Sequence, residues 1–227
     1  MVQKLSVFLP SYNEEKNLPY LIEECDKYLS KNLDQYEIIV IDDGSTDNTA
    51  PVVSELSKEY KNLRLVKHEG NQGYGQAIRT GIKESKYPWT FFMDSDNQFK
   101  IEDLEKFLNH DDYDLIIGYR LKRNDPLKRL IASRIYGMFV KALFGLTVRD
   151  IDCAFKLMRR DAVANLGFVS NSFFASTELL VKAKKKGLKI KEIGVRHYPR
   201  KEGVSTVTIA RVKNSLIELG KLYAALP

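Results

Sequence analysis

Cysteine is scarce in this sequence, and long hydrophobic runs are missing. Two cysteines, Cys25 and Cys153, stand far apart among 227 residues without a C-x-x-C spacing, so neither a disulfide framework nor a zinc site is indicated. We therefore expect a reducing, cytoplasmic environment. Lys141 and Arg149 interrupt the most apolar segment, which does not reach the roughly 18–20 apolar residues that cross a bilayer.

A secretion signal, metal-ligand spacing of histidines and internal repeats are also absent. The first residues, MVQKLSVFLP, contain no apolar stretch of about 7–15 residues followed by a cleavage site. This predicts no export, and any membrane contact should be peripheral, at the cytoplasmic face. The three histidines, His68, His110 and His197, are expected at the surface or in loops. Without a repeat or low-complexity linker, residues 1–227 are predicted to form one domain.

Positive charge is in excess, with 36 Lys and Arg residues against 30 Asp and Glu and a net charge of +6. This balance indicates an anionic partner, which could be nucleotide phosphates, nucleic acid or an acidic membrane surface. The aromatic residues are scattered rather than interleaved with Arg and Lys on one predicted sheet face, which disfavours nucleic acid. A non-catalytic nucleotide or nucleic-acid binder stays open as a distant alternative.

Short apolar runs alternate with longer amphipathic segments over the first 118 residues. The runs are near-continuous rather than alternating, which is typical of a mainly parallel sheet covered by helices on both faces. Beyond residue 118 we expect a long basic and apolar segment at 126–146, a helix at 176–186 and a last helix near the end. The predicted class is α/β, with strands at 5–10, 36–43, 63–68, 89–96, 112–118, about 153–158 and 189–195.

Polar clusters follow three of these strands, at 10–14, 42–47 and 94–98. Ligands of parallel α/β sheets lie beyond the carboxyl ends of the strands, so we expect the three clusters to converge on one rim. Asp94 and Asp96 could turn toward one divalent cation, with Gln98 adding a neutral oxygen, because Mg²⁺ and Mn²⁺ prefer oxygen ligands. The alternative for this cluster is a solvated Asp/Asn turn that ends the strand.

The other two clusters could bind a nucleoside. Asp42 and Asp43 close a strand, where a carboxylate can accept hydrogen bonds from a ribose or base. Tyr12 could lie against the base, and Glu14 could accept from the base or ribose. A solvent-facing turn and an ordinary helix start remain the alternatives for these clusters.

A glycine-rich segment, GNQGYG at 70–75, precedes a predicted helix and could present backbone amides to an anion. It lacks the Walker lysine and does not follow the first strand, so neither a P-loop nor a dinucleotide fingerprint is supported. A tight turn with close helix packing is the favoured interpretation.

With these residues in view, the chain resembles the family 2 glycosyltransferases of GT-A fold, in the dolichyl-phosphate mannose and glucose synthase group. The motifs PSYNEE, DDGSTD, GNQGYGQAIRTG, DSDNQ, GYR, DIDCAFK and PRKEGVS occur in the family's order and approximate spacing. The resemblance implies that a hexose moves from a GDP- or UDP-sugar to a polyprenyl (dolichyl-type) phosphate with Mg²⁺ or Mn²⁺. It also implies a donor half at 1–118 and an acceptor half at 119–227. By this resemblance the residues that hold the nucleoside are Pro10, Tyr12, Glu14 and Asp42, the metal ligands are Asp94, Asp96 and Gln98, and the residues facing phosphates are Arg120, Arg134 and Arg200. From their place in the same strand-end clusters, Asp43, Asp94 and Ser95 are also expected to bind the donor.

Two features leave the sugar open. Thr206 stands where many mannose synthases have a lysine, and DIDCAFK is closer to the glucose synthases. Charge stabilisation of the leaving diphosphate would come from the cation and Arg200. A phosphate acceptor, ionised at neutral pH, needs no general base, and Arg120 and Arg134 could position it through forked hydrogen bonds. Inversion at the anomeric carbon is expected.

Glu178 carries the second hypothesis, in which the acceptor is a glycan hydroxyl and Glu178 is its general base. It could equally be an acid at a helix N-terminus, stabilised by the helix dipole. The segment 127–144 places apolar residues at three- and four-residue steps beside Lys and Arg, which is typical of a helix at a membrane interface. Such a helix could also simply cover the sheet.

Overall fold

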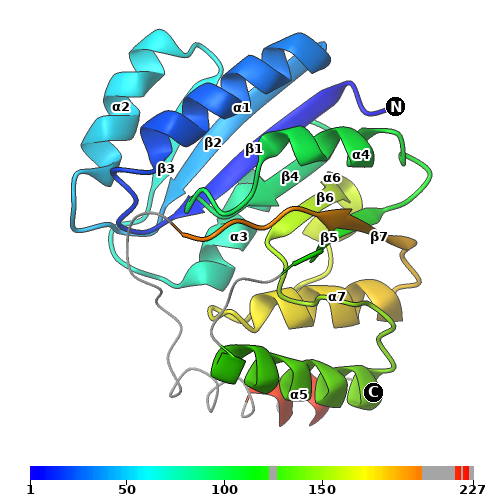
Figure 1. Cartoon of the computed structure of the whole chain (residues 1–227). Coiled ribbons are helices and arrows are strands. Elements are labelled where there is room, and N and C mark those ends of the chain that lie inside the picture. The colour runs from blue at the N-terminus through cyan, green and yellow to red at the C-terminus, as the bar shows by residue number, and fades with distance from the viewer. Residues whose placement is uncertain (123–126, 201–217, 221, 225–227) are drawn as a thin grey trace.

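One seven-stranded sheet runs through the part of the chain that the computed structural model describes, residues 1–122, 127–200, 218–220 and 222–224 (Figure 1). The strand order is β3-β2-β1-β4-β6-β5-β7, and β6 runs antiparallel to both of its neighbours while the remaining pairs are parallel. The strands are β1 (Lys4–Ser11), β2 (Gln35–Asp42), β3 (Leu63–Lys67), β4 (Trp89–Met93), β5 (Leu115–Arg120), β6 (Phe155–Arg159) and β7 (Ile190–Val195).

The central strands are buried on both faces, as their apolar runs predict. β1 and β2 pair in parallel from Lys4 opposite Gln35 to Ser11 opposite Asp42, so the two strands end in step. Every β1 residue after Lys4 is buried, and so is every β2 residue after Gln35. The prediction of a mainly parallel α/β sheet is confirmed.

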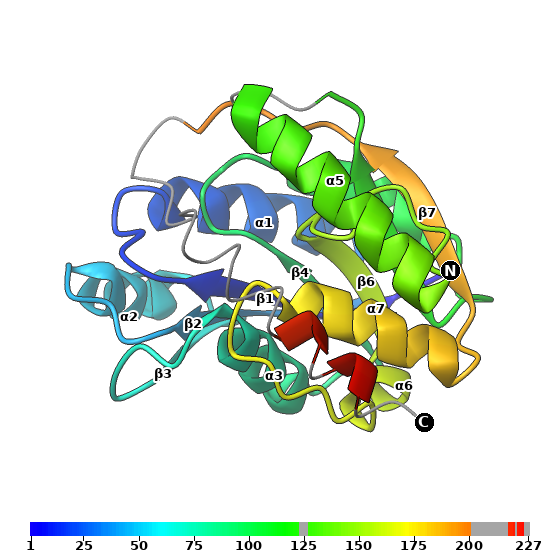
Figure 2. The ribbon, with the colours of Figure 1, turned by 90° about the horizontal axis from the view of Figure 1, so that it is seen from below.

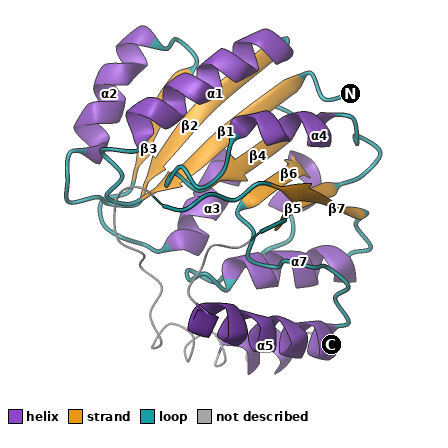
Figure 3. Cartoon of the chain, in the orientation of Figure 1, coloured by secondary structure: helices purple, strands orange, loops and turns teal. Residues whose placement is uncertain are grey.

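Helices cover both faces of the sheet (Figures 1 and 3). One face carries α1 (Leu18–Asn32), α2 (Thr49–Glu59) and the short pair η1 (Ile101–Leu104) and α4 (Glu105–Leu108). The other carries α3 (Tyr74–Glu84), α6 (Arg160–Ala164) and α7 (Ala175–Lys185). The close helix packing expected of the glycine segment is present, since a Cβ on Gly81 of α3 would lie 2.2 Å from the Phe8 ring.

A further helix, α5 (Leu127–Phe144), lies outside α7 and away from the sheet in Figure 1, and it runs beside α7 in the view from below (Figure 2). Tyr136 of α5 is within 3.2 Å of the Thr177 hydroxyl of α7. The face of α5 turned away from the protein exposes Ile135, Met138 and Phe139, which are 59%, 63% and 55% exposed. Among the described residues, no helix combines the length and the apolar character that a membrane span requires.

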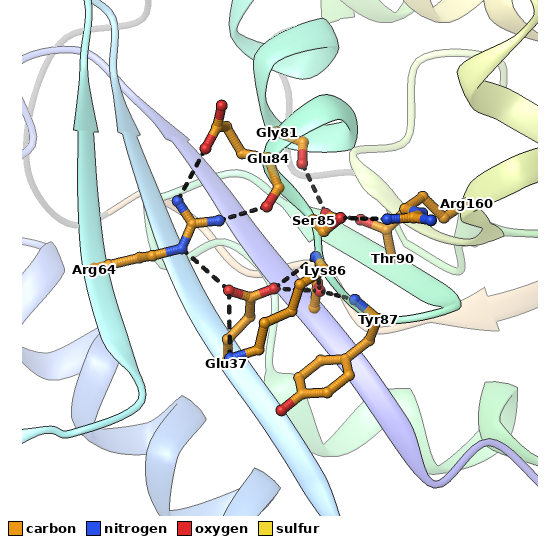
Figure 4. Close-up of polar contacts among 10 residues, drawn as sticks. Glu37, Arg64, Gly81, Glu84, Ser85, Lys86, Tyr87, Thr90 and Arg160 are labelled. Carbon is orange, nitrogen blue, oxygen red and sulfur yellow. Dashed lines mark hydrogen bonds and ion pairs between the residues drawn. The ribbon is translucent and has the colours of Figure 1, made fainter.

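The rim of the sheet opposite the three polar clusters is closed by a buried polar network (Figure 4). Glu37, 2% exposed, accepts hydrogen bonds from the Ser6 hydroxyl at 2.6 Å, the Lys86 backbone at 2.9 Å and Arg64 Nε at 3.1 Å. Arg64 also reaches Glu84 at the end of α3. This network fixes α3 against the amino ends of the strands.

The expected elements match the structure closely, with the strand near 153–158 beginning at Phe155 and the helix near 176–186 beginning at Ala175. The last helix is present as helical residues at 218–220 and 222–224. The rest of that expected helix lies outside the described residues.

Candidate active site

The three polar clusters meet at the carboxyl ends of β1, β2 and β4, as the parallel arrangement predicts. The Ser95 hydroxyl donates to the Pro10 carbonyl at 2.8 Å and lies 2.7 Å from the Ser11 hydroxyl. The Asp43 backbone amide donates to the Ser11 carbonyl at 2.9 Å. Ser95 is 2% exposed, so its side chain points into the sheet and joins the strand ends rather than facing the open rim.

The loops after β1 and β2 are bound to each other. The Thr46 amide donates to the Asn13 side chain at 2.8 Å, and the Glu14 amide to the Thr49 hydroxyl at 2.9 Å. Asn13 has a φ of 58°, a left-handed conformation that asparagine tolerates better than most residues. The arrangement leaves Tyr12 at the outside of the rim, 37% exposed.

Asp42 is the acidic residue best placed to receive a ligand at the end of β2. It is fully buried, and its Oδ1 accepts the Ser45 amide at 2.9 Å. Its Oδ2 is buried with no hydrogen-bond partner among the described residues. An unsatisfied buried carboxylate oxygen is costly, and a hydroxyl or N–H donor of a bound nucleoside would remove that cost.

Asp43 is instead fully engaged within the protein. Its carboxylate accepts the Gln72 amide at 2.9 Å and the Gly73 amide at 2.8 Å, and it lies 2.8 Å from His68 Nδ1. These contacts hold the glycine segment against β2. His68 lies in the loop after β3, within the expectation of a surface or loop position, but its ring is 8% exposed, with Nε2 3.0 Å from the Thr80 hydroxyl. Spacing alone could not show that it pairs with Asp43.

Asp94 and Asp96 form an acidic pair beyond β4. The Tyr74 hydroxyl donates to Asp94 Oδ1 at 3.0 Å, and the Gln98 amide donates to Asp96 Oδ1 at 3.1 Å. Burial raises the pKa of Asp94 to about 7, and the neighbouring Asp96 charge adds to the rise. Because a cation would offset the negative charge that opposes ionisation of Asp94, a divalent cation fits this pair.

The protein would supply part of a cation's coordination at this site. No group of three or more His, Cys, Asp or Glu side chains placed to hold a metal occurs in the described ranges. Two carboxylates suffice for Mg²⁺ or Mn²⁺ when substrate phosphates and water complete the shell. Gln98 lies in the same turn, and its side-chain amide donates to the Tyr198 carbonyl at 2.9 Å.

The segment after β7 brings Arg200 to the acidic pair from a distant part of the sequence. Arg196 binds Asp103 through its backbone amide at 2.7 Å and its Nε at 3.1 Å, and the Tyr198 amide donates to the Gln98 carbonyl at 2.8 Å. Arg200 Nη2 then lies 2.8 Å from Asp96 Oδ2 and 3.6 Å from Glu14 Oε1.

Glu14 completes the acidic side of this contact. Burial raises its pKa, although the Asn17 side chain donates to it at 2.6 Å. A single guanidinium therefore faces carboxylates from two of the three clusters.

Arg120, at the end of β5, is held by an acid of its own. Its Nε and Nη2 donate to the two oxygens of Asp150 at 2.7 and 2.8 Å. The loop that carries Asp150 is fixed by fully buried Lys156, whose ammonium donates to the carbonyls of Ile151 and Cys153. Arg134 lies in α5, but its side chain is outside the described residues, so its position relative to Arg120 stays a prediction.

Glu178 lies in the first turn of α7 and is 3% exposed. Its Oε2 accepts the backbone amides of Val169 and Ser170 at 2.9 and 2.8 Å, and its Oε1 lies 2.8 Å from Lys182 Nζ. Both oxygens are therefore engaged with the protein, an arrangement that favours a supporting role for this acid in holding the 169–170 loop.

Comparisons with known proteins agree with this geometry. The model of the family described as glycosyl transferase family 2 matches residues 6–167. A dolichyl-phosphate beta-glucosyltransferase of Trichomonas vaginalis is 32% identical over 212 residues, and the match covers 84% of this chain and 64% of that protein. An undecaprenyl-phosphate 4-deoxy-4-formamido-L-arabinose transferase of Yersinia enterocolitica is 28% identical, with 96% of this chain and 67% of that protein covered. The chain thus spans 64% and 67% of the length of these relatives.

A solved structure is similar over nearly the whole chain. It is glucosyl-3-phosphoglycerate synthase from Mycobacterium tuberculosis in complex with Mn²⁺, UDP-glucose and phosphoglyceric acid. The TM-score is 0.77 at 19% identity, and the match covers 98% of this chain and 80% of that one. At this identity the likeness shows the fold, and the GT-A prediction is confirmed.

Proposed function

Because the chain belongs to glycosyl transferase family 2, we propose that it transfers a hexose from a nucleotide diphosphate sugar to a polyprenyl phosphate, with inversion at the anomeric carbon. One observation carries the proposal. The unpartnered Asp42 oxygen, the Asp94 and Asp96 pair and the guanidinium of Arg200 lie at one rim of the sheet. These groups match, in order, the nucleoside, the cation and the diphosphate of such a donor.

The donor's nucleoside is assigned to the rim of β1 and β2. Asp42 would accept from the ribose or base through its Oδ2, and exposed Tyr12 would lie against the base. Glu14 stands at the same loop, with Pro10 shaping the strand end behind it. Asp43 and Ser95, whose polar groups are engaged inside the protein, are assigned to holding these loops in place.

The diphosphate is assigned to the acidic pair. Mg²⁺ or Mn²⁺ on Asp94 and Asp96, with Gln98 in the same turn, would offset the charge that develops on the leaving phosphate. Arg200 already stands 2.8 Å from Asp96 and could donate to the phosphate oxygens once they are present. Charged donors that are preorganised where negative charge develops stabilise the transition state most.

The acceptor phosphate is assigned to Arg120 and Arg134. Asp150 fixes the plane of the Arg120 guanidinium, which reduces the entropy lost when that group binds an anion. A phosphate monoester carries close to two negative charges at neutral pH and can attack without a base. The engaged carboxylate of Glu178 counts against the alternative in which a glycan hydroxyl is the acceptor.

Membrane contact is part of the proposal. Ile135, Met138 and Phe139 follow a three- and four-residue step and are each more than half exposed, while Lys128 and Arg129 precede them on the same helix. A stripe of this kind suits the interface of an anionic membrane, which is where a polyprenyl phosphate presents its head group. We place this contact at the cytoplasmic face.

Glucose and UDP are the proposed sugar and nucleotide, because the Trichomonas relative bears the name of a beta-glucosyltransferase and the solved neighbour contains UDP-glucose. The test is incubation of the chain with Mn²⁺, a polyprenyl phosphate and either labelled UDP-glucose or labelled GDP-mannose. Chloroform-soluble label from UDP-glucose is the expected product, and Asp96→Asn should abolish it. Label that stays in water or on protein would overturn the acceptor assignment, and label from GDP-mannose alone would overturn the donor.

A further inference from the structure

We propose that Tyr74 is a positioning residue that orients the Asp94 carboxylate for the cation, and that the glycine segment 70–75 holds Tyr74 in place from both sides of the site. This inference rests on the proposed function, since it takes the acidic pair as the cation site. The contact that carries it is the hydrogen bond from the Tyr74 hydroxyl to Asp94 Oδ1 at 3.0 Å.

The ring of Tyr74 is fixed as firmly as its hydroxyl. It stacks on Phe173 with ring centroids 5.2 Å apart and planes 25° from parallel. Phe173 lies just before α7, on the side assigned to the acceptor. Tyr74 therefore connects the cation site, at the end of β4, to the beginning of α7.

The backbone on either side of Tyr74 is anchored in two directions. Toward β2, the amides of Gln72 and Gly73 donate to Asp43 at 2.9 and 2.8 Å. Toward α7, the Gly75 amide donates to the Asn171 carbonyl at 3.0 Å. The backbone around Tyr74 is thus bound to Asp43 on the donor side and to the loop at Asn171 on the acceptor side.

The two glycines that flank Tyr74 permit this contact. A Cβ on Gly73 would lie 2.2 Å from the Asn171 carbonyl oxygen, and one on Gly75 would lie 2.0 Å from the Ser170 carbonyl oxygen. Both distances are too short for any side chain, so the segment approaches the 170–171 backbone more closely than other residues allow. The same loop is held from behind by Glu178, through the Ser170 amide. This gives Glu178 a place in the site without contact to substrate.

Residues that orient a metal ligand from outside the coordination shell usually change metal affinity or activity by about 10–100-fold when mutated. The loss of the Tyr74 hydroxyl should act in this range, because its ring and the packing around it are kept in phenylalanine. Tyr87, at the opposite rim (Figure 4), is the matched control, since its backbone amide bonds Ser6 and its ring lies near Lys86.

The experiment measures Mn²⁺ binding by electron paramagnetic resonance with the full chain and saturating UDP, for the wild type, Tyr74→Phe and Tyr87→Phe. We expect Tyr74→Phe to bind Mn²⁺ about 10–100-fold more weakly, with a changed spectrum of the bound ion, and Tyr87→Phe to match the wild type. Gly75→Ala, which displaces the same segment, should also weaken Mn²⁺ binding.

Wild-type affinity in Tyr74→Phe would overturn the inference while leaving the proposed function intact. The wild type is also titrated with saturating GDP in place of UDP, and failure to bind Mn²⁺ with both nucleotides would overturn the cation site and this inference with it. Comparing kcat with the KM for the polyprenyl phosphate gives a second readout, because a role of Tyr74 in packing alone would lower stability without changing kcat. Tyr74→Phe should lower kcat and leave the KM for the polyprenyl phosphate unchanged.

Discussion

Replacing Arg200 by methionine should change Mn²⁺ affinity in opposite directions depending on whether nucleotide is present. In the ligand-free protein the guanidinium lies 2.8 Å from Asp96 and 3.6 Å from Glu14. It therefore neutralises part of the negative charge that would otherwise attract a cation. Without nucleotide, Arg200→Met should therefore bind Mn²⁺ more tightly. With UDP, the variant loses a donor to the diphosphate and should bind the Mn²⁺–UDP pair more weakly.

The size of the effect follows from the geometry. A hydrogen bond to a charged group contributes about 1.5–3 kcal/mol. The Arg200 side chain is 26% exposed and Asp96 6%, so water screens part of the interaction and the lower end of that range, about 1.5–2 kcal/mol, is appropriate. At about 1.4 kcal/mol for each factor of ten, this predicts a change of about 10–30-fold in each direction.

The assay is a titration of free Mn²⁺ by electron paramagnetic resonance, with and without UDP. Arg160→Met is the charge control, because Arg160 pairs with exposed Asp161 at 3.1 Å and lies at the opposite rim. It should match the wild type in both conditions. Equal or weaker Mn²⁺ binding by Arg200→Met without nucleotide would refute the reasoning.

Three further changes test other parts of the structure. Because the folded pKa of Asp94 is raised to about 7, the native state holds its proton more firmly than the unfolded state and stability falls as pH rises from about 4 to 7. Asp94→Asn should therefore raise Tm at pH 8 without divalent cations, by about 2–4 °C for each kcal/mol gained in the free energy of unfolding. At pH 4 the gain in Tm should be small, and no gain at pH 8 would contradict the raised pKa of Asp94. Glu178→Gln should lower the free energy of unfolding in urea by about 1–3 kcal/mol, because its contact with Lys182 is weakened. Turnover should stay within tenfold of the wild type, and a loss of 10²-fold or more would instead support Glu178 as the general base. Gly81→Ala should lower the free energy of unfolding by about 1–3 kcal/mol, because its methyl group would press on the Phe8 ring; a neutral result in urea would show that the α3 contact can yield.

Much of the fold and the convergence of the clusters was predictable from the sequence, for a physical reason. Near-continuous apolar runs specify a covered parallel sheet, and parallel strands bring their carboxyl ends to one rim. Asp42, Asp94 and Asp96 could therefore be placed together from strand ends alone. The direction of β6 was not predictable, because its run FKLMR reads the same whichever way the strand lies.

The roles of individual side chains at the rim were harder to predict. Asp42 and Asp43 are adjacent and chemically identical, yet the pleat sends Asp43 toward His68 and the glycine segment and leaves an oxygen of Asp42 unpartnered. Tyr74 could not be found by motif, since its partner Asp94 lies 20 residues away. A tyrosine between two glycines was the available signal.

Long-range placement by loops was beyond the sequence altogether. Arg200 reaches Asp96 across 104 residues because Arg196 and Tyr198 bind the segment after β4, and no periodicity records that path. Family resemblance supplied the prediction for Arg200. The same resemblance did not reveal that Glu178 is engaged on both oxygens, since hydrogen bonding from a neighbouring loop leaves no pattern in the chain.

The most direct test of the central claim is a crystal structure of the chain grown with Mn²⁺ and UDP, with diffraction recorded at the manganese absorption edge. The claim predicts one anomalous peak between Asp94 and Asp96, at about 2.1 Å from a carboxylate oxygen and in contact with the UDP phosphates. Manganese bound elsewhere, or UDP held at the rim with no ion between it and these two carboxylates, would contradict it.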